Sequence, residues 1–187
     1  ITQEFYPTEN EQRLYDLVSE YLQRQNLYAL PSSQRQLMTL ILRKLLASST
    51  YAISGTLEAL SNKLDAVIEN QEAVPLFEEK ISEDFEVFDE MKDEWSEDDE
   101  ETEEKKTYTP EEIKSIKEES QSLKEFHSLA KAIKKNSKGE VLMTALKAGF
   151  DEAEKRGGVK KAVIFTESTR TQKYLENILE NTEYSGK

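Results

Sequence analysis

Hydrophobic residues recur at helical spacing over the first 70 residues of the chain. The letters TENE at residues 8–11 have capping-box spacing, and the apolar side chains that follow share one face, which predicts a helix over residues 9–25. A second helix is predicted to start at Pro31 and is apolar over a wide arc, as expected for the central helix of a bundle. A third, over residues 50–70, repeats one apolar face and is expected to pack against the second.

Two further helices are predicted in the second half of the chain. The letters TPEE at residues 109–112 place a capping threonine, a proline and two acids where a helix start favours them. The apolar stripe of this helix runs to about Asn136 and leaves Glu118 and Glu119 outside it. The letters GEVLMTALKAGFDEAEKR then continue at helical spacing and end at a pair of glycines, a typical C-terminal stop.

The pattern changes at residues 162–165, where AVIF is a short apolar run behind the two glycines. Such a run predicts a buried parallel strand, and it leads into an amphipathic helix spelled RTQKYLENILEN. The fold class predicted is therefore mostly α, a helical bundle with a short β-α unit at the C-terminal end. Because one strand cannot form a sheet alone, we expect either a fragment of a larger α/β protein or pairing with another molecule or with TQEFYP at residues 2–7.

The charge of the chain is concentrated in one segment. Of the 187 residues, those from 72 to 106 include 17 acids and 4 bases, which accounts for the whole net charge of −13. The first half of this segment has enough apolar residues for a short docked helix, whereas SEDDEETEEKK at residues 96–106 is typical of a solvated linker. The alternative is an acidic segment that mimics nucleic acid or docks on a basic protein partner.

Composition excludes several kinds of metal site, disulfide and membrane segment. The chain has no cysteine and one histidine, His127, which excludes disulfides and thiolate metal sites and makes a histidine-based zinc site unfavourable. No window approaches the roughly 18 apolar residues of a membrane span, and the start does not resemble a signal peptide. We therefore expect a cytoplasmic protein with no membrane partner.

Three stretches resemble one family, the Swi/Snf-type helicase-like ATPases of superfamily 2, particularly the bacterial branch related to the RNA-polymerase-associated ATPase. KKAVIFTESTRTQKYLENIL resembles motif IV at the entrance to the second RecA-like lobe. LASSTYAISGTLEAL and FYPTENEQRLYDLVSEYL are similar to helices between the two lobes and at the exit of the first, and all three occur in the family's order. Thr50 stands where the family usually has proline, and Ser168 where it usually has an aromatic residue.

The resemblance implies a division of the chain. Residues 1–71 and 107–158 would be helical inter-lobe regions, residues 72–106 an acidic and partly disordered insertion, and residues 159–187 the truncated start of the second lobe. The full-length protein would then be an ATP-dependent helicase or translocase that acts on nucleic acid, with duplex DNA as the expected partner.

Nucleotide chemistry is expected outside these residues. The chain contains neither the phosphate-loop pattern G-x-x-x-x-G-K-[ST] nor an Asp-Glu-x-His sequence. We therefore expect the chain alone to be inactive and to hold no cofactor, while ATP and Mg²⁺ would bind the full-length protein.

The candidate nucleic-acid-binding residues lie at the end of the predicted strand and in the lysine run KAIKKNSKG. Hydroxyls at a helix N-terminus and nearby cations suit a backbone phosphate. The candidates are Thr166, Ser168, Thr169, Arg170, Lys134 and Lys135, and Glu167 lies among them. The hydroxyl residues, the arginine and the lysines each have a purely structural alternative role. Ser168 or Thr169 would cap the last helix, and Arg170 would pair with a carboxylate. The lysines would complement the negative end of a helix dipole at a helix C-terminus.

A second function remains open, a stand-alone α-helical interaction module whose acidic segment docks a partner. The two hypotheses differ in a physical property of the chain. The module predicts a compact, stable particle, whereas the translocase fragment predicts an exposed apolar edge around residues 163–165 and self-association.

Overall fold

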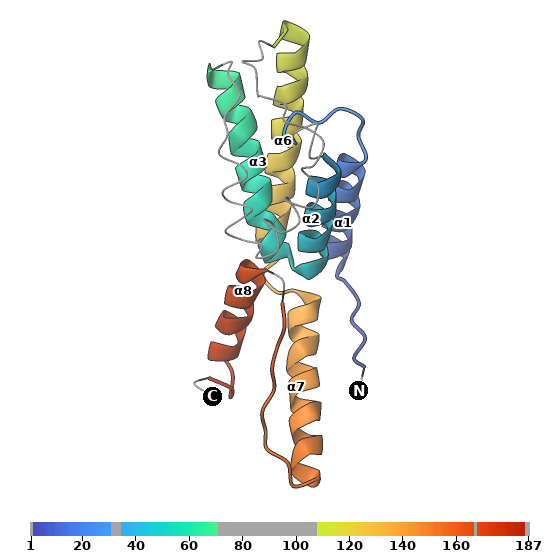
Figure 1. Ribbon diagram of the computed structural model, residues 1–187, viewed down its shortest axis with the longest axis vertical. Helices are drawn as coiled ribbons and strands as arrows, with labels where there is room; N and C mark the ends of the chain where they lie inside the picture. The colour runs from blue at the N-terminus through green and yellow to red at the C-terminus, as the bar shows by residue number, and fades with distance from the viewer. Residues whose placement is uncertain (1, 31–34, 71–107, 167, 186–187) are drawn as a thin grey trace, which may run out of the picture.

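The chain is described from a computed structural model, in which residues 2–30, 35–70, 108–166 and 168–185 are described. These residues are mostly helical, which confirms the predicted helical bundle (Figure 1). The helices are α1 (Glu9–Leu22), α2 (Arg35–Ser48), α3 (Thr50–Asn70), α6 (Pro110–Ala132), α7 (Ser137–Lys155) and α8 (Thr169–Glu180). The acidic segment, residues 72–106, lies outside the described residues.

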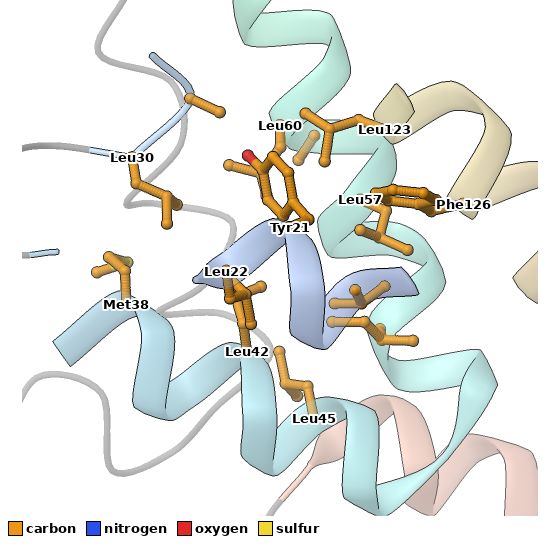
Figure 2. Close-up of a cluster of buried hydrophobic side chains, with 14 of the residues drawn as sticks. Tyr21, Leu22, Leu30, Met38, Leu42, Leu45, Leu57, Leu60, Leu123 and Phe126 are labelled. Carbon is orange, nitrogen blue, oxygen red and sulfur yellow. The ribbon is translucent and has the colours of Figure 1, made fainter. Parts of the chain in front are cut away.

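Helices α1, α2, α3 and α6 form a bundle around one apolar core. The closely packed pairs within it are α3 with α6, α2 with α3, α1 with α6, and α1 with α2. Figure 2 shows how the core is built, with Leu42 of α2, Leu57 of α3 and Phe126 of α6 gathered around Tyr21 of α1. The apolar arc of α2 is buried as its pattern predicted, with the exception of Leu40, which is exposed.

The helix starts follow the local sequence signals. The Thr8 side chain accepts a hydrogen bond from the backbone N–H of Glu11, whose carboxylate accepts one from the backbone of Thr8. The same reciprocal capping box joins Thr109 and Glu112 at the start of α6. Helix α1 ends at Leu22 and α6 at Ala132, a few residues before the predicted ends. The capping signals therefore located the starts of α1 and α6 more closely than their ends, while the predicted start of α2 at Pro31 lies outside the described residues.

Glu119 departs from the sequence-based expectation, because it is buried and not on the outer face of α6. Its carboxylate accepts hydrogen bonds from the Tyr21 hydroxyl (2.8 Å) and from the backbone N–H groups of Tyr28 (2.8 Å) and Ala29 (3.1 Å). Burial of a charged group is tolerated when its lone pairs are satisfied in this way. The carboxylate holds the segment after α1 against α6.

The remaining elements form an arm, defined as α7, residues 156–166 and α8. Figure 1 shows α7 and α8 below the bundle, with the extended segment between them. The turn out of α7 is made by Gly157, whose φ of 72° favours glycine, and the Gly158 N–H donates to the carbonyl of Ala153 at 2.7 Å.

The predicted buried strand is wrong for the described residues. Residues 159–166 are extended and lead into α8, but they form no strand, and neither do residues 2–8. Val159 is 73% exposed, Val163 78% and Phe165 91%. A β-branched apolar run becomes a buried strand only beside partner strands, and the described part of the chain supplies none.

Candidate functional site

A cleft of about 810 Å³ lies where the C-terminal turn of α2 meets the N-terminal turns of α7 and α8. Its wall combines hydroxyl and amide groups with two lysines, Lys44 and Lys138, and with apolar side chains such as Leu142, Phe165 and Leu175. None of the described residues that line it is acidic. Such a cleft favours an anionic ligand that also has an apolar or flat surface.

The start of α8 forms one wall through a chain of hydroxyl groups. Ser168 is buried at the N-cap, and its hydroxyl accepts from the Thr171 N–H at 3.3 Å. The Thr171 hydroxyl shares hydrogen bonds with the hydroxyls of Ser48 (2.9 Å) and Ser49 (3.0 Å) at the end of α2. The capping alternative for Ser168 is therefore confirmed.

The start of α7 forms the opposite wall and is attached to the bundle through Asn136. Although Asn136 occupies the N-cap position, its side chain does not cap α7; Oδ1 accepts from the backbone N–H and the hydroxyl of Thr50, both at 2.9 Å. Its own N–H donates to the Tyr174 hydroxyl at 3.0 Å. Asn136 thus joins α3, α7 and α8.

Two more contacts fix the first turn of α7. The Ser137 N–H donates to Glu11 Oε1 at 2.8 Å, and its hydroxyl donates to Oε2 of the same carboxylate. Partial burial acts to raise the pKa of Glu11, but the hydrogen bonds from Ser137 and Thr8 outweigh it and lower that pKa below 4.5. Lys138 donates to the carbonyl of Ala47, and its Nζ lies 4.9 Å from the centroid of the Phe5 ring.

The structure brings only some of the predicted candidates to the cleft. Thr166 and Ser168 line it, and Thr169 follows as the first residue of α8. Glu167 is outside the described residues. Lys134 and Lys135 are exposed beyond the end of α6 and are not part of the described wall, and Lys135 lies 3.8 Å from Glu140.

Arg170 packs against the bundle. A β-carbon added to Gly55 of α3 would lie 1.0 Å from the guanidinium nitrogen Nη1 of Arg170, so the guanidinium occupies the space that the missing side chain leaves. Next to it, the rings of Tyr51 and Tyr174 stack with centroids 6.0 Å apart. Arg170 therefore helps to seat α8 on α3.

Sequence reasoning did not assign Asn136, Thr171 or Tyr174 to the site. These residues come together only because α7 and α8 both start beside the hydroxyl run at residues 48–50. The sequence did contain a signal for this site. The hydroxyl residues 48–50 stand between two apolar helices, and hydroxyls buried there need hydrogen-bond partners.

Comparison of the chain with protein-family models, with curated proteins and with solved structures finds no match. No helix among the described residues is long and apolar enough to cross a membrane. In the same residues, no cluster of three or more histidine and acidic side chains is placed to hold a metal ion.

Proposed function

We propose that this chain is the inter-lobe helical region, with the first part of the second RecA-like lobe, of a Swi/Snf-type ATP-driven nucleic-acid translocase in the cytoplasm. ATP and Mg²⁺ would bind the motor lobes, and duplex DNA is the proposed substrate. The acidic segment would serve as a docking site for a protein partner.

One observation carries the proposal. An extended apolar segment, residues 159–166, is exposed and leads into the capped helix α8. A β-α unit without its neighbouring strands would have this arrangement, and a motor lobe built on a parallel sheet would supply those strands. The resemblance of the same residues to motif IV supports the same proposal.

The cleft supports the choice of an anionic substrate. Lys44 and Lys138 lie on a wall without described acids, beside the hydroxyl of Thr166 and the N-terminus of α8. Cations and a helix N-terminus attract backbone phosphates irrespective of base sequence. This arrangement suits a protein that moves along nucleic acid.

The experiment uses the chain extended on both sides by its natural coding sequence. ATP hydrolysis is measured with and without duplex DNA, and DNA binding is measured by fluorescence anisotropy at increasing salt. We expect DNA-stimulated hydrolysis, and we expect the double variant Lys44→Gln/Lys138→Gln to bind DNA more weakly with a shallower salt dependence. The log–log slope should fall by about 0.9 for each phosphate that the variant no longer neutralises.

A matched control is Lys147→Gln, an exposed lysine of α7 that is not part of the described cleft wall. It removes one positive charge outside the cleft, where the double variant removes two within it, and should leave the slope unchanged. Equal slopes for the control and the double variant would remove the cleft from DNA binding.

The competing function, an α-helical interaction module, is favoured by one feature. Helices α1, α2, α3 and α6 share a core that needs nothing from the arm. If the naturally extended protein shows no nucleotide turnover, the translocase proposal is wrong and the module becomes the better account.

A further inference from the structure

Buried polar side chains gather where the arm meets the bundle. Those found there are Ser49, Thr50, Asn136, Ser137, Ser168 and Thr171, whereas the other buried polar residues described, Thr56, Ser61, Glu119 and Ser120, lie within the bundle. A concentration of this kind is unusual, because burying a polar group is unfavourable unless a partner satisfies it.

The arm buries little apolar surface in exchange. The buried residues of α7 are Ser137 and Gly139, and the buried residue of α8 is Thr171. Helix α2, by contrast, buries six apolar residues in the bundle core. Among the described helices, α7 closely packs with none, and α8 closely packs with α3 alone.

The bonds that join the two parts are short-range and directional. Asn136 binds Thr50, Ser137 binds Glu11, and Thr171 binds the end of α2. All three arise from the first turns of α7 and α8. Farther along α8, Tyr174 adds a ring stack on Tyr51 of α3 and accepts from the Asn136 N–H. A satisfied hydrogen-bond network specifies one geometry, whereas apolar contacts alone would allow sliding.

From this arrangement we propose that the junction is a polar latch. The latch, defined as Asn136, Thr50, Ser137, Glu11, Thr171, Ser48 and Ser49, holds the arm at one angle. Exchange of its hydrogen bonds for bonds to water, or to a polar ligand in the adjacent cleft, releases the arm to swing as a unit.

Two physical arguments support release. An intramolecular hydrogen bond exchanged for a bond to water changes the free energy little, because both states keep a partner. Water and ligands in the cleft reach the edge of the latch, because Ser48, Ser49, Asn136 and Thr171 are part of the cleft wall. Release therefore exchanges hydrogen-bond partners and exposes little apolar surface, and a ligand that prefers one state shifts the population. This inference does not depend on the proposed function.

The test measures distances between paired spin labels by double electron–electron resonance. Because the chain has no cysteine, each pair is introduced without removing a native thiol. Exposed sites give three pairs: Glu118 with Lys147 spans the junction, Glu118 with Asn62 reports on the bundle, and Lys147 with Lys173 reports on the arm.

The perturbation is Asn136→Ala/Thr171→Val, which removes two tie points of the latch. The control is Thr56→Val, the same loss of a buried hydroxyl inside α3. We expect the perturbed protein to show a second, shifted population for the junction pair, while the bundle pair, the arm pair and the control keep one population each. Faster amide exchange at residue 136, whose backbone N–H donates to the Tyr174 hydroxyl, should accompany the shift.

Three results would overturn the inference. The first is a junction distribution in the perturbed protein as narrow as in the wild type. The second is broadening of the arm pair, because α7 and α8 would then separate from each other and not swing together. The third is the same shift in the Thr56→Val control, which would indicate general loosening of the fold.

Discussion

The buried carboxylate of Glu119 gives the sharpest test of how the bundle is held together. It accepts three hydrogen bonds, from the Tyr21 hydroxyl and from the N–H groups of Tyr28 and Ala29, at 2.8 to 3.1 Å. Its side chain is only 4% exposed. Replacement of Glu119 by alanine removes the shared acceptor and leaves three donors without it.

The expected cost follows from these donors. A buried donor left unsatisfied costs about 1–3 kcal/mol. Because the Tyr28 N–H is only partly buried and gains water, we expect Glu119→Ala to lower the free energy of unfolding by about 3–5 kcal/mol. Tyr21→Phe removes one donor and leaves the carboxylate with two, so about 1 kcal/mol is expected for it.

Urea unfolding followed by circular dichroism measures both variants. The control is Glu118→Ala, one residue earlier on α6, whose side chain is 71% exposed and pairs only loosely with Lys114 at 3.9 Å. It should cost less than about 0.5 kcal/mol. The free energies of unfolding of Glu119→Ala and of the control are then compared. A difference below about 1 kcal/mol, which is about fivefold in the ratio of folded to unfolded protein, would mean that the carboxylate does not hold the segment after α1.

A double-mutant cycle separates the hydrogen bond from general packing. In the Glu119→Ala background the Tyr21 hydroxyl has already lost its acceptor, so Tyr21→Phe should cost clearly less there than in the wild type. Equal costs in the two backgrounds would mean that the two side chains do not interact. The cycle remains informative if Glu119→Ala is measured with a stabilising osmolyte.

The other predictions concern the arm. The hydrogen bonds of Glu11 lower its pKa in the folded protein. Their contribution to the free energy of unfolding is therefore present above about pH 4.5 and is lost as the pH falls through the folded pKa. Glu11→Gln should make the free energy of unfolding less dependent on pH in the acid range. Gly149→Ala places its methyl group in open space and should stabilise α7 by about 0.5–1 kcal/mol, measured by thermal unfolding. Gly139→Ala should show no such gain, because its β-carbon would lie 2.9 Å from the Tyr174 hydroxyl. Phe165→Asp should shift the chain toward monomer in sedimentation velocity at increasing concentration, and an unchanged profile would remove Phe165 from self-association.

The helices of the bundle were predictable because their signals are local. Thr8 and Thr109 each cap the helix that follows them, and the apolar face of each helix repeats along its own sequence. Glu119 was not predictable, because its donors lie about ninety residues earlier in the chain. An acidic residue in a helix is expected on the outer face until the fold supplies partners for it.

The structure of the arm also depends on contacts that the sequence pattern does not specify. The letters AVIF have the composition of a buried strand, yet burial requires neighbouring strands, and a residue pattern does not specify whether they are present. The sequence predicted part of the cleft, since Thr166 and Ser168 were candidates from their place before the last helix and both line it. Asn136 and Thr171 were not, because each acquires its role from the hydroxyl run at residues 48–50.

The bundle and the arm are held by different forces, and this difference makes their responses separable. Apolar burial and the Glu119 bonds act within the bundle, so variants there should change global unfolding and leave the junction distance of the folded protein unchanged. The latch acts between the parts, so Thr171→Val should alter the junction distance while the unfolding of the bundle changes little. A protein whose two parts responded together to both kinds of variant would be one cooperative unit, and a swinging arm would then have no physical basis.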